Sequence, residues 1–342
     1  MYNNLSSIFR LLQLKRLIFK KLTKITKMQN IELRIILFTA FIFVSYTSIF
    51  GQTLSPAGVG QNNIIWLEAN DLSGPLSDGF VWPDKTSNGF NATEIADGIN
   101  TSSLTTIGGQ QYLRFSGLSG EQLIIPDDNA TTNLLDGASE FSIITVFNTG
   151  ATDTRAIISK RLNSGAGNRS WAMFYNSGFN MFAYAGATTV GGPGSVAAAG
   201  NPYIATMTVN ASLSTGSVRM FVNTEAEGST GSNVSIPDRT EDVIIGTFDS
   251  GDSRYFNGDI AEIIVYRDAL NGGERLVLEN YLAQKYGVAI TFDYFGNGPN
   301  FDSNYEDNIS GIGTQNGTEK HASSGYSSGL QISELNNSLD AS

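Results

Sequence analysis

Acidic residues in three loops of the sequence are placed where they could bind a metal ion. The candidate ligands are Asp127 and Asp128 in PDDNATTN (126–133) and Asp249 and Asp252 in FDSGDS (248–253), and the third loop is WPDKTSNG (82–89). Loop carboxylates and backbone carbonyl oxygens are the ligands that Ca²⁺ prefers in proteins. Asp and Asn are also common turn residues, because their side chains accept hydrogen bonds from nearby backbone N–H groups. The loops therefore fit either a calcium site or ordinary turns, and Ca²⁺ is the one cofactor that the sequence suggests.

Aromatic side chains form a second set of candidate functional residues. Their rings can pack against the apolar faces of sugars, while Asn, Asp and Gln side chains bind sugar hydroxyls. The candidates are Trp82, Trp171, Tyr175, Tyr184 and Tyr203. Each of the five fits a hydrophobic core better than a binding site. Trp171 and Tyr175, for example, share one face of the predicted strand 170–176 with Met173 between them. Trp66, in NIIWLEA (63–69), is predicted to be a core residue.

Short β-strands are predicted to position these residues. Between Gln52 and about Gly287, eleven segments combine β-branched and aromatic residues with period-two alternation, and Gly, Asn, Asp, Ser or Pro residues separate them. No helical periodicity of useful length occurs before residue 272. This pattern predicts an all-β fold, a two-sheet antiparallel sandwich or jelly roll.

The last predicted strand, 259–267 (DIAEIIVYR), is apolar on both faces. Strict alternation places Ala261, Ile263 and Val265 on one face and Ile260, Glu262, Ile264 and Tyr266 on the other. A strand of this kind is expected in the middle of a sheet, covered on both sides.

A single helix is predicted directly after this strand. Asn271 and Glu274 fit an Asn-x-x-Glu capping box, and Gly287 is placed to end the helix after Lys285. An apolar stripe runs along it, formed by Val277, Leu278, Tyr281 and Leu282. The helix is therefore expected to pack on the sandwich.

Charge and reactive side chains limit the possible functions. Residues 1–51 hold eight of the 21 Lys and Arg residues and one of the 32 acidic residues, which leaves 13 bases and 31 acids, a formal charge of −18, from Gln52 onward. Such an acidic protein is not expected to bind nucleic acids or anionic membranes. The absence of cysteine excludes thiol catalysis, thiolate metal sites and disulfide bonds.

The basic excess belongs to a predicted targeting segment. Residues 35–50 (IILFTAFIFVSYTSIF) are mostly apolar, follow Arg34 and precede the small residue Gly51. This predicts a secretory signal peptide over 28–51, cleaved after Gly51, with residues 1–27 as an upstream extension. A retained membrane anchor is the alternative, although the run is short for a span and no stop-transfer charges follow it.

The segment 256–270 (FNGDIAEIIVYRDAL) resembles the final-strand signature of laminin-G-like, concanavalin A-like jelly-roll domains. That signature is Phe-x-Gly-x-Ile-x-Glu-x-x-x-Tyr-x-x-x-Leu, matched here by Phe256, Gly258, Ile260, Glu262, Tyr266 and Leu270. Earlier segments match in order, so the resemblance covers about residues 62–287. The segment 272–288 (GGERLVLENYLAQKYGV) is similar to the helix that ends this domain in large secreted surface proteins of Bacteroidetes. The resemblance implies one lectin-glucanase-type domain over 52–288.

The family implied by the resemblance also contains glycoside hydrolases and polysaccharide lyases. Hydrolases of this fold place three acids on one strand as Glu-x-Asp-x-x-Glu, a pattern that does not occur here, and the lyases need a histidine. Glu262 has Ala261 and Ile264 where partner acids would lie, and the single histidine, His321, lies beyond the domain. Glu262 is expected to hydrogen-bond within the sandwich, with a place in a ligand groove as the alternative. The prediction is a protein without enzymatic activity.

Residues 289–342 are polar, with scattered apolar residues. NISGIG (308–313) resembles the opening of a second β-module that often follows this sandwich. The region is predicted to be the start of an incomplete second module, and a disordered tail is the alternative.

These patterns predict a secreted, non-catalytic recognition module, part of a cell-surface or adhesin-type protein, that binds a carbohydrate or another surface ligand. The first alternative is a purely structural spacer of an adhesin, and the second is a hydrolase or lyase. An exposed aromatic pair on a concave face would favour binding, whereas a filled face would favour the spacer.

Overall fold

A computed structural model describes residues 55–59, 62–96, 98, 101–127, 134–150, 153–163, 165–176, 180–195, 200–231 and 234–291, and the backbone of 310–315 and 319–324. The chain divides into two compact units, Met1–Thr53 and Leu54–Ser342, and the described residues all belong to the second. The predicted upstream extension and signal peptide lie outside the described residues. Within the described ranges, no helix is long and apolar enough to cross a membrane.

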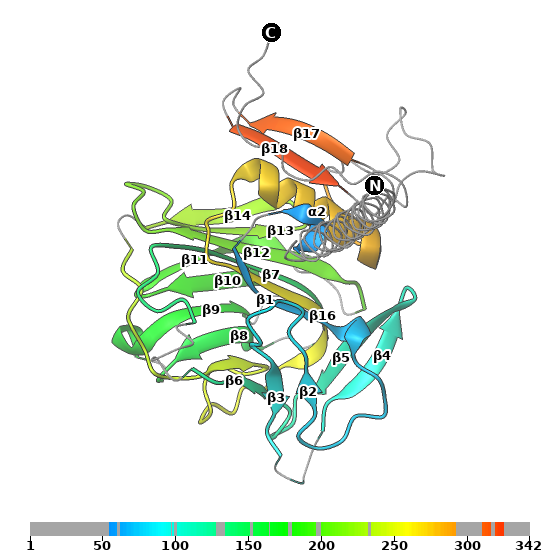
Figure 1. The fold of residues 1–342 in the computed structure, drawn as a ribbon. Helices are drawn as coiled ribbons and strands as arrows, with labels where there is room; N and C mark the ends of the chain where they lie inside the picture. Colours follow the sequence, from blue (N-terminus) through cyan, green and yellow to red (C-terminus); the bar gives the residue numbers. More distant parts are fainter. Residues whose placement is uncertain are drawn as a thin grey trace, which may run out of the picture. The chain divides into compact units, whose positions relative to one another are not determined.

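Two antiparallel sheets form the domain, as the strand pattern predicted (Figure 1). In spatial order, sheet A contains β14 (Glu225–Thr230), β13 (Val218–Val222), β12 (Tyr203–Asn210), β7 (Glu140–Thr149), β16 (Asn257–Tyr266), β5 (Gln110–Ser116) and β4 (Ser103–Ile107), while β1 (Asn63–Glu68) also pairs with β16. Sheet B contains β11 (Thr188–Ser195), β10 (Asn180–Ala185), β9 (Arg169–Tyr175), β8 (Arg155–Arg161), β15 (Val243–Ile245), β6 (Leu123–Ile125), β3 (Ala92–Glu94) and β2 (Val81–Trp82). The all-β sandwich is confirmed.

Short 3₁₀ turns and a small hairpin complete the described elements. The turns are η1 (Pro56–Gly58), η2 (Ala69–Asp71) and η3 (Ala166–Asn168). In the region predicted to open a second module, β17 (Ser310–Gln315) pairs with β18 (Glu319–Ser324), so most of the NISGIG segment is a strand.

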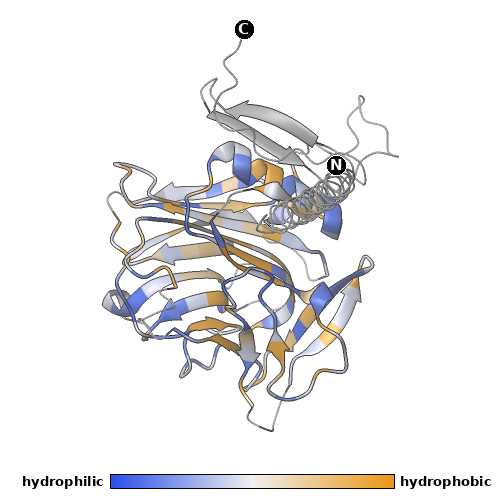
Figure 2. Ribbon diagram, in the orientation of Figure 1, coloured by the Kyte–Doolittle hydropathy of each residue, from blue (hydrophilic) through white to orange (hydrophobic). Residues whose placement is uncertain are grey.

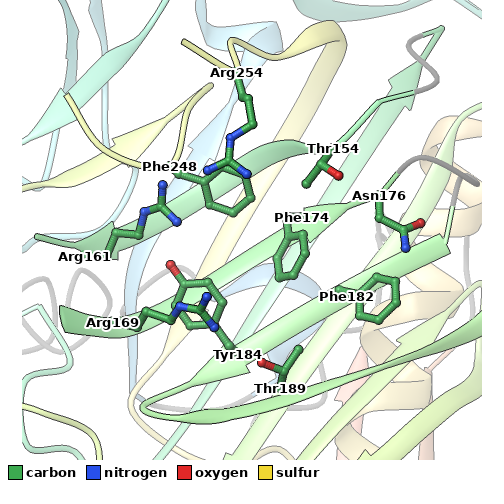
Figure 3. Close-up of a pocket in the computed structure, with 10 residues that line it drawn as sticks. All are labelled: Thr154, Arg161, Arg169, Phe174, Asn176, Phe182, Tyr184, Thr189, Phe248 and Arg254. Carbon is green, nitrogen blue, oxygen red and sulfur yellow. The ribbon is translucent and has the colours of Figure 1, made fainter. Parts of the chain in front are cut away.

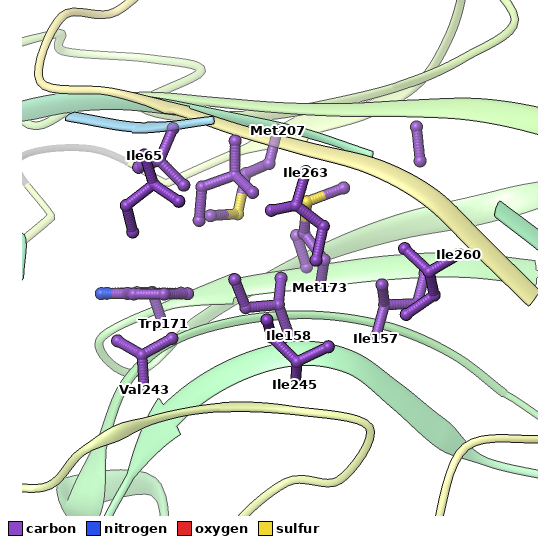
Figure 4. Close-up of a cluster of buried hydrophobic side chains, with 14 of the residues drawn as sticks. Ile65, Ile157, Ile158, Trp171, Met173, Met207, Val243, Ile245, Ile260 and Ile263 are labelled. Carbon is purple, nitrogen blue, oxygen red and sulfur yellow. The ribbon is translucent and has the colours of Figure 1, made fainter. Parts of the chain in front are cut away.

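The main hydrophobic core lies between the two sheets. Ile65, Met207 and Ile263 point from sheet A toward Trp171 and Ile158 of sheet B, and each is at most 1% exposed (Figure 4). Hydrophobic residues recur along the strands of both layers (Figure 2). The apolar area buried between two such faces is the main source of stability for a sandwich. This chain has no cysteine, so disulfide bonds do not add to that stability.

The strand β16 is central in sheet A, as its apolar faces predicted. It pairs with β7 along one edge, and with β5 and β1 along the other. The predicted assignment of its faces is wrong at one point, because the register with β7 shifts between Ile260 and Glu262. This bulge turns Ile260 into the main core beside Ile263 and Val265, whereas Ala261 faces the opposite side with Ile264 and Tyr266.

The predicted helix is present as α2 (Gly272–Tyr286) and covers the outer face of sheet A (Figure 1). The Asn271 side chain accepts hydrogen bonds from the N–H groups of Gly273 and Glu274, and the Glu274 carboxylate accepts one from the Asn271 N–H, which completes the capping box. Gly287 ends the helix in the left-handed conformation, with φ at 65°. The predicted capping box and the stop at Gly287 are confirmed, and the helix continues one residue past Lys285, to Tyr286.

A second hydrophobic cluster lies beneath this helix. From the helix it contains Leu278, Leu282, Ala283 and Tyr286, with Val277 and Tyr281 partly buried against it, and from sheet A it contains Trp66, Tyr112, Ile144, Val146, Ile204, Ala261, Ile264 and Tyr266. The rings of Tyr112 and Tyr286 meet edge to face, 5.8 Å apart. The predicted apolar stripe of the helix therefore docks on the outer face of sheet A.

Gly258, the glycine of the final-strand signature, is required by the close approach of β7. A Cβ atom built on Gly258 would overlap the backbone oxygen of Asn148 and lie 3.0 Å from the Cα of Thr149. We expect Gly258→Ala to destabilise the domain by about 3 kcal/mol, because a backbone neighbour cannot rotate away as a side chain can. The measurement is the free energy of unfolding in urea.

Gly251→Ala is the matched control. Gly251 lies in an exposed loop, and its added Cβ would meet only the Asp249 carboxylate, at an ordinary 3.6 Å. Equal stability of the two alanine variants would contradict the steric role of Gly258.

Candidate functional site

A pocket of about 300 Å³ opens on the outer face of sheet B, the side opposite the main core (Figure 3). It is lined by Thr154, Arg161, Arg169, Phe174, Asn176, Phe182, Tyr184, Thr189, Phe248 and Arg254. Alternation along the strands produces this face, because side chains next to each other in β9 and β10 point to opposite sides. Met173 and Met181 enter the main core, whereas their neighbours Phe174 and Phe182 line the pocket.

Four aromatic rings form the floor of the pocket. The ring of Phe174 is central: its centroid lies 5.6 Å from that of Phe182, 5.9 Å from that of Tyr184 and 5.3 Å from that of Phe248. Phe174 and Phe182 are nearly parallel, at 21°, and both are only partly buried. Tyr184 and Phe248 are buried, and Phe174 packs against both of them. The pocket therefore presents a partly exposed aromatic pair next to two buried aromatic rings.

Three arginines lie over or beside these rings. The guanidinium carbons of Arg161 and Arg254 are each 4.3 Å from the centroid of Phe248, and that of Arg169 is 5.0 Å from the centroid of Tyr184. At these distances a cation is attracted by the negative face of the ring. The planar guanidinium groups thus have defined orientations at the pocket wall.

The predicted calcium ligands Asp249 and Asp252 lie beside this pocket but bind arginine. Asp249 accepts a hydrogen bond from Arg161 Nε at 2.8 Å, and Asp252 accepts one from Arg161 Nη2 at 2.5 Å and one from Arg254 Nε at 2.9 Å. Burial opposes ionisation of Asp252, but the hydrogen bonds and charges of Arg254 and Arg161 outweigh it and lower its pKa. A calcium ion here would have to displace a guanidinium group, so this carboxylate pair does not fit a calcium site.

Asp127, another predicted calcium ligand, is buried in an ion-paired cluster. Its carboxylate and that of Asp136 both accept a hydrogen bond from the Lys160 ammonium group, and the three side chains are fully buried. Burial raises the pKa of Asp136 to about 6, with Lys160 opposing the shift and Asp127 adding to it. Asp128 lies outside the described residues, within which no group of three or more potential ligands could hold a metal.

Most of the predicted sugar-binding rings serve the core. Trp82, Trp171 and Tyr175 are at most 1% exposed and belong to the cluster between the sheets, so they have no free ring face for a ligand. Tyr203 is partly buried and packs against Phe147, with centroids 6.2 Å apart. Tyr184 is the one predicted aromatic residue that lines the pocket. For the first three, the structure corresponds to the core alternative that the sequence left open.

Glu262 is fully buried beneath α2 and is held by three donors. Its carboxylate accepts hydrogen bonds from Trp66 Nε1 at 2.6 Å, from the Tyr286 hydroxyl at 2.7 Å and from Lys285 Nζ at 2.8 Å. Burial raises the pKa of Glu262, and Lys285 opposes this shift. The hydrogen bonding within the sandwich that the sequence predicted is present, and the carboxylate does not line the pocket on sheet B.

Glu68 extends this network toward the surface. It pairs with Lys85 at 2.5 Å and with Lys285 at 2.8 Å, and Lys85 lies 4.4 Å above the ring of Trp66. Burial alone would raise the pKa of Glu68, but the two lysines outweigh it and lower the pKa to about 2. The ionised carboxylate of Glu68 therefore stabilises the folded state.

Sequence reasoning missed most of the pocket residues. Phe174, Phe182 and Phe248 were not singled out, and neither were the three arginines. A signal was present for two of them: in β9 and β10, core residues alternate with large aromatic residues, which marks a strand whose second face is also apolar. The arginine and Phe248 positions depend on contacts between segments far apart in the sequence, and alternation does not reveal those.

Comparison with known families identifies the domain. Residues 119–274 match the model of the concanavalin A-like lectin/glucanases superfamily. These residues belong to that superfamily. The family resemblance of the final-strand signature is thereby confirmed. No curated protein matches the chain.

Solved structures resemble the concanavalin A-like domain at low sequence identity. Trypanosoma rangeli sialidase matches with a TM-score of 0.47 and 14% identity, over 67% of this chain and 34% of the sialidase. Domain 4 of AbnA, a GH43 extracellular arabinanase from Geobacillus stearothermophilus in complex with arabinotriose, matches at 0.46 and 14%, over 64% of this chain and 98% of that domain. This chain thus spans about a third of the sialidase, and at such similarity neither structure identifies its ligand.

The network around Glu68 predicts a specific acid response. Because its pKa falls from 4.5 to about 2 on folding, its contribution is present above pH 4.5 and is lost as the pH falls through 2. Between pH 6 and pH 2, we expect the wild type to lose about 3 kcal/mol more of unfolding free energy than Glu68→Gln. Denaturant unfolding at a series of pH values measures this difference.

Glu225→Gln, a change at an exposed glutamate of β14, is the control and should follow the wild-type curve. Parallel curves for the wild type and Glu68→Gln would show that the lysine pair does not stabilise the ionised Glu68.

Proposed function

We propose that this chain is a secreted, non-catalytic recognition module that binds a glycan in the pocket on the outer face of sheet B. The observation that supports this proposal is the partly exposed pair Phe174 and Phe182, set nearly parallel in an open pocket. Sugar rings have apolar C–H faces that pack on aromatic rings, and both phenylalanines keep part of their surface exposed.

Polar groups around the rings suit the hydroxyl groups of a sugar. Asn176 and Thr189 line the same pocket, and the guanidinium groups of Arg161 and Arg254 are held by Asp249 and Asp252. Amide, hydroxyl and guanidinium groups offer hydrogen-bond donors at defined positions. Groups already held in place lose little conformational entropy on binding, which favours affinity.

The state of the nearby acids supports binding without catalysis. A glycosidase needs one carboxyl group that keeps its proton near neutral pH. Asp249 and Asp252 instead both accept hydrogen bonds from Arg161, and the pKa of Asp252 is lowered. Asp252, whose ionised form is favoured, is therefore not suited to act as a general acid.

The sequence supports an extracellular setting. The apolar run 35–50 after Arg34 supports export, and the acidic, hydroxyl-rich region that follows suits an extracellular surface. A glycan-binding domain in a surface or adhesin-type protein is consistent with both features. The polysaccharide of another cell or of the surroundings is the proposed class of partner.

Single substitutions in the aromatic pair test this proposal. We expect the full chain to bind at least one oligosaccharide on an array of neutral and acidic glycans. Phe174→Ala and Phe182→Ala should each weaken binding of that glycan about tenfold, which corresponds to about 1.4 kcal/mol. Titration calorimetry with the same glycan measures the change, in Ca²⁺ and again in EDTA, and equal affinity is expected because arginines already balance the nearby carboxylates.

Leu118→Ala is the control, because Leu118 is 50% exposed and does not line the pocket. It should bind as the wild type does. Undiminished affinity in both phenylalanine variants would place the site elsewhere, and an array on which no glycan binds would reject the proposal in favour of a structural spacer.

A further inference from the structure

The buried cluster of Lys160, Asp127 and Asp136 lies on the inner side of sheet B, away from the pocket. Lys160 belongs to β8 and is the cross-strand partner of Trp171, a residue of the main core. Asp127 follows β6, and Asp136 lies in the segment between β6 and β7. All three side chains have no exposed surface, and the ammonium group donates to both carboxylates.

Backbone contacts fix both carboxyl groups beside the amine. Asp127 accepts a hydrogen bond from the Leu134 N–H at 3.1 Å, and its own N–H donates to Asp242 at 2.9 Å. Asp136 accepts one from the Arg239 N–H at 3.2 Å. Backbone N–H groups therefore hold both carboxylates in place next to the Lys160 amine. Two reactive groups that are kept in contact react as if each were present at a very high effective concentration.

Three ionisable groups in such a place are costly to bury. An ammonium group and two carboxylates lose their hydration, and their mutual attraction recovers only part of that free energy. A neutral link between the Lys160 amine and the Asp127 carboxyl group would remove two of the three charges, and Asp136, whose pKa is raised by burial, can then take up a proton instead of remaining an unpaired carboxylate. The burial of this cluster therefore favours a covalent product.

We propose that Lys160 and Asp127 form an intramolecular isopeptide bond, with Asp136 as the proton-transferring group. The ammonium group passes one proton to the Asp127 carboxylate, and the neutral Nζ then attacks Cγ of Asp127. Asp136 takes a second proton from the nitrogen and gives it to the departing hydroxyl, which leaves as water. One C–N bond forms, one C–O bond breaks, nothing is oxidised or reduced, and Asp136 returns to its starting state.

This bond would cross-link two strands that are not neighbours. In sheet B, β15 lies between β6 and β8, so the link joins the chain after β6 to β8 across an intervening strand. It closes the chain between residues 127 and 160, which restricts the unfolded state as a disulfide does. The sequence has no cysteine, so a disulfide cannot supply such a link.

Tandem mass spectrometry of the denatured and digested full chain tests the proposal directly. The expected result is a branched peptide pair joined through Lys160 and Asp127, lighter than its two linear peptides by the mass of one water molecule. Recovery of only linear peptides, with a Lys160 amine that reacts with an acylating reagent after denaturation, would overturn it. A link from Lys160 to Asp136 would overturn the assignment of the acceptor.

Variants test the role of Asp136. We expect Asp136→Ala to fold, as judged by circular dichroism, and to lack the branched peptide, whereas Asp153→Ala, a change at a surface acid paired with Arg155, should retain it. If the alanine variant does not fold, Asp136→Asn, which keeps the side-chain shape, replaces it and is likewise expected to lack the branched peptide. A full yield of branched peptide in either folded Asp136 variant would refute the proton-transfer role.

Discussion

A single buried carboxylate joins the parts of the domain that are farthest apart in the sequence. Glu262 on β16 accepts hydrogen bonds from Trp66 on β1 and from Lys285 and Tyr286 on α2. A charge in a dry interior is tolerated only while its partners remain in place, because an unpaired carboxylate there costs several kcal/mol. The first strand, the last strand and the helix are therefore fixed to one another by the same atoms. This explains why a glutamate without catalytic partners can be part of a family signature.

The position of the helix also decides where a ligand can approach. Because α2 covers the outer face of sheet A, the strands beneath it are apolar on both sides. The outer face of sheet B carries instead the Phe174–Phe182 pair and the arginine–aspartate pairs. The outer face of sheet A is thus covered by α2, whereas the outer face of sheet B presents aromatic and charged groups to solvent.

Local patterns in the sequence predicted the elements better than they predicted the contacts. The capping box of Asn271 and Glu274 and the stop at Gly287 were predictable, because each depends on residues within a few positions. The bulge between Ile260 and Glu262 was not, because it arises from pairing with β7, a strand more than 100 residues earlier. For the same reason, Asp249 and Asp252 read as possible metal ligands, although Arg161, nearly 90 residues away, is their actual partner.

The order of strands in sheet A has a consequence for how the chain acquires its structure. β16 is the last strand of the sandwich, yet it lies between β7 on one edge and β5 with β1 on the other. Until β16 has left the ribosome, β7 cannot be joined to β5 and β1 through it. The apolar residues on the outer face of sheet A also remain uncovered, because α2 follows β16 in the chain. The domain cannot complete its fold progressively from the amino terminus. It must wait for almost its entire length, so the earlier strands remain without their central partner for a long interval during synthesis.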